Sequence, residues 1–153
     1  MVFFSHTEPK KELIKHLQEV AEFSVRYGDD RLKEVHRIIG YAHDFGKYTT
    51  FFQEDRLFKQ KSWGPKANHA YLSAIFGAFL CMKNNNLSKT LPLLAFSVIL
   101  SHHGDIKQFS GSDCLPDLSG RSIKHRETLE RLKILDMQIE NMIKNKSIIH
   151  WKP

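Results

Sequence analysis

The stretch YAHDFGKYTTFFQ, residues 41–53, places a histidine and an aspartate side by side where a helix is expected to end. Adjacent helical residues point about 100° apart, so His43 and Asp44 would form a poor salt bridge with each other. The same pair suits a metal ion that lies beyond the end of the helix. This hypothesis requires further ligands elsewhere in the chain.

The composition is that of an ordinary globular protein, with 153 residues, 41% apolar and 26% charged. This length fits one domain, so we expect residues 1–153 to form a single unit. The sequence contains no run of about 18 apolar residues and no visible secretory signal, which argues against a membrane span. Cys81 and Cys114 are isolated thiols without metal-ligand spacing. They favour a cytoplasmic location, where thiols stay reduced.

The net charge of +6 indicates a polyanionic partner, because lysine and arginine release counterions when they bind phosphates. A basic protein without such a partner would carry the same charge, so both interpretations stay open at this point. The basic strip that could follow a phosphate backbone comprises Arg121, Lys124, Arg126, Arg131 and Lys133. A solvated helix face is the alternative explanation of this strip.

Apolar residues recur at helical spacing through most of the chain, and strand signals are weak throughout. We therefore predict an all-α bundle. Thr7 is expected to cap the first helix, and the nearly all-apolar segment 91–103 is expected to be central and buried. The predicted helices span residues 7–27, 30–44, 49–58, 69–82, 91–103 and 121–146, with a loop at 105–120.

Five histidines and one aspartate lie at predicted helix edges or ends: His16, His43, Asp44, His69, His102 and His103. Imidazole suits Mn, Fe, Co, Ni and Zn, and a carboxylate can bridge two such ions. Six ligands exceed the need of one tetrahedral ion, so the sequence predicts a two-metal site in the core, formed at helix ends. Such a pair of ions activates water and stabilises the leaving oxygen of a phosphodiester.

Each of these residues also has a structural explanation when it is taken alone. His16 could be a half-buried surface histidine, and His69 could simply be exposed near a helix start. A ring of the pair at 102–103 could bind the last carbonyls of a helix. Lys47 could be an ordinary solvated lysine. A metal site explains all of these positions together, whereas the alternatives require them to be unrelated.

The order H…HD-x-x-K…H…HH resembles the HD-domain phosphohydrolase superfamily. It is most similar to the HD nuclease that accompanies the helicase in type I CRISPR interference, a system of antiviral defence. The resemblance covers about residues 10–106 and falls on four segments: LIKHLQEVA (13–21), AHDFGKYTTFFQ (42–53), NHAYLSA (68–74) and LSHHGD (100–105).

This resemblance implies a helical HD fold and a cytoplasmic endonuclease that cuts single-stranded DNA. Its partners would be a CRISPR-associated helicase and, through it, the RNA-guided surveillance complex. The implied cofactors are two divalent ions, with Mn, Ni, Co or Fe favoured over Mg or Zn. Carried over by position, Asp44 bridges the ions, with His16 and His43 on one side and His69, His102 and His103 on the other. Lys47 neutralises charge on the scissile phosphate. Beyond the stretch that the resemblance covers, Arg121 and Lys124 of the basic strip are the candidates for binding the DNA.

The chain departs from the family pattern in two ways. The pattern includes a late aspartate ligand, for which the chain offers several candidates without a clear match: Asp105, Asp113, Asp117 and Asp136. The chain also lacks a P-loop, so any unwinding must come from a partner or from another part of a longer chain.

Two other functions stay open: hydrolysis of a small nucleotide, such as a cyclic dinucleotide or a nucleoside triphosphate, and a degenerate HD module that only binds partners.

Overall fold

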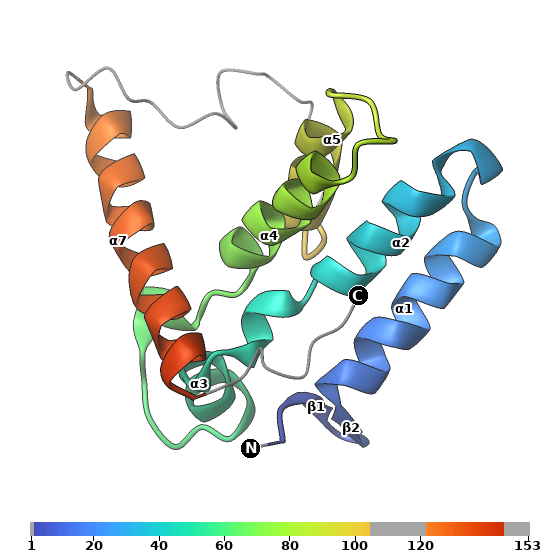
Figure 1. Ribbon diagram of the computed structural model, residues 1–153. Coiled ribbons are helices and arrows are strands. Elements are labelled where there is room, and N and C mark those ends of the chain that lie inside the picture. The colour runs from blue at the N-terminus through green and yellow to red at the C-terminus, as the bar shows by residue number, and fades with distance from the viewer. Residues whose placement is uncertain (1, 105–121, 146–153) are drawn as a thin grey trace.

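The computed structural model describes residues 2–104 and 122–145 and confirms the predicted all-α bundle (Figure 1). Two strands precede the helices: β1 (Phe4–Thr7) and β2 (Lys10–Glu12). The α-helices are α1 (Leu13–Tyr27), α2 (Lys33–Ala42), α3 (Thr50–Phe52), α4 (Ala70–Lys83), α5 (Leu91–Leu100) and α7 (Ile123–Lys144). Short 3₁₀ and π turns connect them at η1 (Asp30–Leu32), η2 (Phe45–Tyr48), η3 (Gln53–Leu57) and η4 (Gly64–Ala67).

The first helix begins at Leu13, so the predicted start at Thr7 is wrong. Thr7 ends β1, which pairs with β2 in an antiparallel hairpin. The side-chain amide of Gln53 extends this hairpin, because its Oε1 accepts from the Phe4 amide at 3.1 Å and its Nε2 donates to the Phe4 carbonyl at 2.9 Å. These bonds join positions 49 residues apart, and local sequence patterns carry no signal for them.

The core lies where α1, α2 and α4 meet. Leu13 and Leu17 of α1 are completely buried, and they pack in one cluster with residues of the turn after α2 and of α4. A second cluster of Ala42, Ala74 and Ile99 joins α2 to α4 and α5. The two clusters hold the ends of four helices close to one another, which is the arrangement that a site at helix ends requires.

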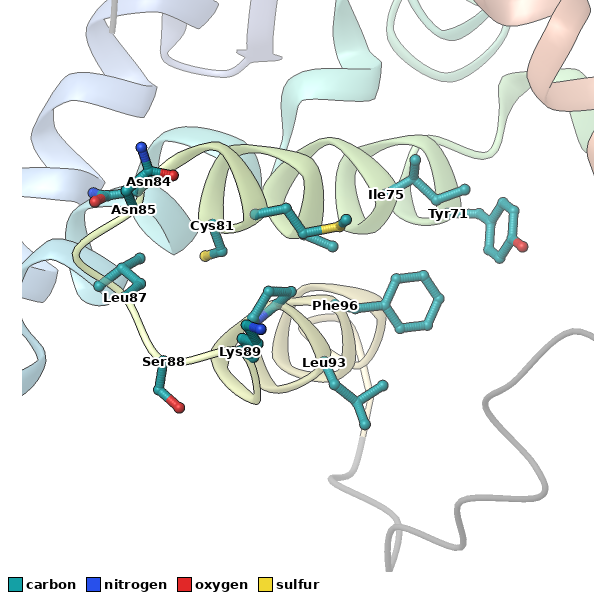
Figure 2. A pocket seen from close by; sticks show the side chains of 13 residues that line it. Tyr71, Ile75, Cys81, Asn84, Asn85, Leu87, Ser88, Lys89, Leu93 and Phe96 are labelled. Carbon is teal, nitrogen blue, oxygen red and sulfur yellow. The ribbon is translucent and has the colours of Figure 1, made fainter.

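The prediction that segment 91–103 is central and buried is wrong for much of its surface. Ala95 and Ile99 of α5 are buried against α2 and α4, but Leu93, Leu94 and Val98 are exposed. The packing of α5 on α4 and α2 covers one side of the helix. On another side, α4, α5 and the loop between them line a cavity of about 860 Å³ (Figure 2).

α7 stands beside the rest of the bundle and meets it through its C-terminal half, where it contacts α3, η4 and α4 (Figure 1). Ser122 caps it, because its side-chain oxygen accepts from the amide of His125 at 3.0 Å. Among the residues that the structure describes, no helix is both long and apolar enough to cross a membrane.

We predict that Gly40→Ala will destabilise the protein by about 1–3 kcal/mol, the usual cost of overpacking a core. A Cβ atom at Gly40 would lie 2.4 Å from the Cα of Ala21, so α1 and α2 would have to separate. Urea unfolding of the metal-free protein measures the change. Gly104→Ala is the control, because no atom lies within 4 Å of its added Cβ. Equal stability of the two variants would show that close packing at Gly40 is unimportant.

Candidate metal centre

The HD and HH doublets follow α2 and α5. In each doublet, the Nδ1 atom of the first histidine contacts a backbone carbonyl of the preceding helix. The Nδ1 of His43 lies 2.7 Å from the carbonyl of Gly40, and the Nδ1 of His102 lies 2.5 Å from that of Ile99. A carbonyl only accepts, so each Nδ1 must carry a hydrogen and donate it. In a neutral ring this leaves a lone pair on Nε2. The helix ends therefore fix which nitrogen is free to bind a cation.

Asp44 lies at the centre of the cluster and is almost fully buried. Its Oδ2 lies 3.2 Å from the Nε2 of His16 and 3.3 Å from that of His43. Its Oδ1 lies 3.0 Å from the Nε2 of His69 and 3.4 Å from that of His102. Each carboxylate oxygen thus faces its own pair of imidazoles.

The donor atoms fall into two groups that share Asp44, and within each group they all lie within 4.8 Å of one another. Within the groups, the Nε2 atoms of His16 and His43 lie 3.2 Å apart, and those of His69 and His103 lie 2.9 Å apart. The groups are His16, His43 and Asp44, and Asp44, His69, His102 and His103. The structure therefore brings together all six residues that the sequence singled out as candidate ligands.

This donor set fits a divalent cation. Asp44 Oδ1 and His102 Nε2 are buried, and neither has a hydrogen-bond partner in the described part of the chain. Buried polar atoms without partners are rare in folded proteins, because each costs free energy. A cation would satisfy both atoms, and imidazole nitrogen with carboxylate oxygen is a ligand combination that transition metals and zinc accept.

Burial favours the neutral form of a carboxyl group and by itself would raise the pKa of Asp44. The four surrounding imidazoles outweigh this effect and hold the pKa of Asp44 far below its usual value. The carboxyl is therefore ionised at neutral pH. The imidazoles responsible belong to His102, His16, His43 and His69.

Two of the histidines are held in the neutral form that can bind a metal. Burial lowers the pKa of His69, although Asp44 acts in the opposite direction. Desolvation and the nearby His102 and His69 lower the pKa of His103 to about 4. Both imidazoles are therefore neutral at pH 7, and a cation does not have to displace a proton from them.

The turn after α2 is packed directly against the start of α4, which brings His69 to Asp44. A Cβ atom at Gly46 would lie 2.5 Å from the carbonyl oxygen of His69, so only glycine fits there. The amide of Gly46 donates to the Ser73 hydroxyl at 2.9 Å. The ring of Phe52 meets that of His69 edge-on, with 4.9 Å between centroids. Gly46 and Phe52, which follow the HD pair, thus position His69, which comes later in the chain.

Lys47 is not a solvated surface lysine, because its side chain is only 11% exposed. Its Nζ lies 2.8 Å from Asp44 Oδ2 and donates to the carbonyl of Ser5 at 3.3 Å. The N-terminal hairpin, which the sequence analysis missed, therefore holds this ammonium group. The hairpin also places His6 beside His16, with 6.0 Å between the ring centroids.

α7 supports the cluster through polar side chains that the sequence analysis also missed. The buried amide of Gln138 donates to the carbonyls of Lys66 and Asn68, at 2.8 and 2.7 Å, directly before His69. Asn141 exchanges two hydrogen bonds with Thr50, both 2.8 Å. A glutamine among charged helical residues gives no local sign of such a role, because the carbonyls it binds lie about 70 residues away.

The remaining candidates lie elsewhere. Asp136 is exposed on α7 and belongs to neither donor group, and Lys124 lies in the first turn of α7, away from the ligand-bearing helix ends. Asp105, Asp113, Asp117 and Arg121 lie outside the described residues. A late aspartate ligand therefore has no representative in the part of the chain that the structure describes.

A buried aspartate surrounded by histidines at the ends of several helices is an arrangement suited to a metal-dependent hydrolase. The sequence model of the HD domain matches residues 13–143, and the chain therefore belongs to the HD domain family. No curated protein and no solved structure matches the chain. Membership confirms the expected superfamily and indicates a metal-dependent phosphohydrolase, and the His/Asp cluster is able to hold a metal ion.

We predict that adding Mn²⁺ or Ni²⁺ to the chelator-treated protein will raise its melting temperature by several degrees. An ion at about 100 times its Kd stabilises the folded state by about 2.7 kcal/mol. Asp44→Asn should remove most of the shift, because it removes the charge that both donor groups share. Asp136→Asn, which neutralises an exposed carboxylate outside the cluster, should keep the shift. A full shift in Asp44→Asn would contradict metal binding at this cluster.

We predict that Gln138→Glu will destabilise the fold by roughly 2 kcal/mol or more and will weaken metal binding. The new carboxylate would face two carbonyl oxygens in a buried position, without a donor. Chemical unfolding and metal titration measure the two effects. Gln18→Glu makes the same substitution at an exposed position of α1 and should change neither. Unchanged metal affinity in Gln138→Glu would show that α7 does not position His69.

Proposed function

We propose that this protein is a metal-dependent nuclease that cleaves single-stranded DNA in CRISPR interference. The observation that carries the proposal is the arrangement around Asp44, whose two oxygens face two separate sets of imidazoles with Lys47 beside them. We further propose two divalent ions, one held by each set. The resemblance of the motifs to the CRISPR-associated HD nuclease supplies the substrate, and the net charge of +6 is compatible with it.

When bound, the ions would supply Lewis acidity and positive charge at the scissile phosphodiester. The protein's own part is to hold the donor atoms, to keep Asp44 ionised and to place Lys47. An ammonium group has three hydrogens to donate, and Asp44 and the Ser5 carbonyl take two of them. The third is free for a non-bridging phosphate oxygen, where charge increases during attack.

The substrate would reach the cluster from the side of His103, which is exposed, whereas Asp44 and His69 are buried. An exposed ligand at the edge of the site is compatible with a long strand that enters without being enclosed. The proposed partner is a helicase that delivers this strand, because the chain carries no nucleotide-binding loop of its own.

The test is cleavage of circular single-stranded DNA, supplied with Mn, Ni, Co or Mg in turn. Wild type should cut the circle, which has no ends, and Asp44→Ala should not. Lys47→Gln should lower the rate about 10²–10³-fold, the usual effect of removing one donor to a developing charge. Lys89→Gln, which alters an exposed lysine on the loop between α4 and α5, should cut at the wild-type rate.

Two results would contradict the nuclease. A metal-loaded, folded protein that ignores DNA but hydrolyses a cyclic dinucleotide or a nucleoside triphosphate would be a small-nucleotide hydrolase. A protein that binds metal and hydrolyses none of these would be a partner-binding module.

A further inference from the structure

α7 carries two apolar faces, and the structure covers one of them. The covered face includes Met142, which is buried, and Gln138 and Asn141 fasten it to the bundle through their hydrogen bonds. The second face, here called the outer stripe, is 39–60% exposed at each apolar position. The stripe consists of Leu129, Leu132, Ile139 and Ile143.

The spacing shows that the outer stripe is one continuous surface. Its members follow each other at intervals of 3, 7 and 4 residues, so they lie on one side of a helix with Asp136 in the middle. From Leu129 to Ile143 the stripe is about 21 Å long at 1.5 Å per residue. Exposed aliphatic residues scattered singly are common on proteins, whereas a contiguous apolar row is the kind of surface that binds partners.

The stripe borders an apolar cavity between α7 and α4, with a volume of about 390 Å³. Ile139 of α7 and Phe79 of α4, itself half exposed, both line it. Leu72, Phe76 and Met142 line it as well. The cavity adjoins the stripe at Ile139, and the two together, here called the groove, offer apolar surface of the kind that binds one face of an amphipathic helix.

The charge of Asp136 indicates what this groove binds. Asp136 is exposed, lies within the apolar row and forms no ion pair with any described residue. The stripe extends seven residues to either side of it. If two copies paired through their stripes, the two Asp136 carboxylates would meet in apolar surroundings, which is unfavourable. A partner with a cation at that position would gain an ion pair instead.

We propose that the groove between α4 and α7 binds an amphipathic helix of a partner protein. The helix presents apolar side chains at i, i+3 and i+7 spacing and a central lysine or arginine to Asp136. One of its apolar side chains enters the cavity between Phe79 and Ile139. This surface uses no residue of the metal cluster, so the proposal stands whether or not the protein cuts DNA.

The test uses two synthetic helical peptides of about 21 residues, the length of three heptads. Both have leucine at a and d positions, and they differ in the central a residue, which is lysine or glutamate. Fluorescence anisotropy with the full chain, below the concentration at which the peptides self-associate, should show at least about tenfold tighter binding of the lysine peptide. Asp136→Lys should reverse the preference, and Ile139→Glu should abolish binding of both.

Leu94→Glu is the matched control, because it places the same charge on the exposed face of α5 and should leave binding unchanged. The metal-induced rise in melting temperature should be the same in all variants, which shows that each is folded. Three results would overturn the proposal: no binding of the lysine peptide, binding that ignores Asp136→Lys, or a wild-type dimer that Ile139→Glu dissociates. The last would identify a second copy as the occupant of the groove.

Discussion

The carboxylate of Asp44 is a buried negative charge, and such a charge is stable only when other groups compensate for it. The ammonium group of Lys47 lies 2.8 Å from it, and imidazoles from the ends of four helices surround it. The helices must therefore end at one place, and the core clusters that join α1, α2, α4 and α5 keep them there. The buried oxygen and nitrogen that still lack partners are the atoms that a bound cation would satisfy.

Elements that carry no ligand nevertheless determine the geometry of the site. The N-terminal hairpin accepts a hydrogen bond from Lys47 at Ser5 and is itself held by Gln53. The hairpin therefore contacts the segment after α2 at two places, Lys47 and Gln53. Gln138 of α7 fixes the carbonyls before His69. These contacts are hydrogen bonds between distant parts of the chain, and each directs a neighbouring ligand or charge toward Asp44.

The bundle leaves apolar surface uncovered on α5 and along the outer stripe of α7. α7 is fastened by its other face, so the stripe is available for binding without cost to the fold. The same helix thus supports the His/Asp cluster with one face and offers the proposed interaction surface with the other. A partner bound there would contact the helix that holds the carbonyls before His69, within about two and a half turns of Gln138.

The sequence by itself determined the helical character of the chain and the set of candidate ligands, because helical periodicity and the HD and HH doublets are local patterns. Tertiary structure decided which carboxylate oxygen faces which histidines, and it left Asp136 outside the cluster. It also placed the expected helix start at Thr7 in a strand and left Leu93, Leu94 and Val98 of an apolar helix exposed. Each of these outcomes depends on contacts between residues far apart in the chain. The spacing of hydrophobic residues indicates that one face of a helix is apolar, but it does not indicate whether another part of the protein covers that face.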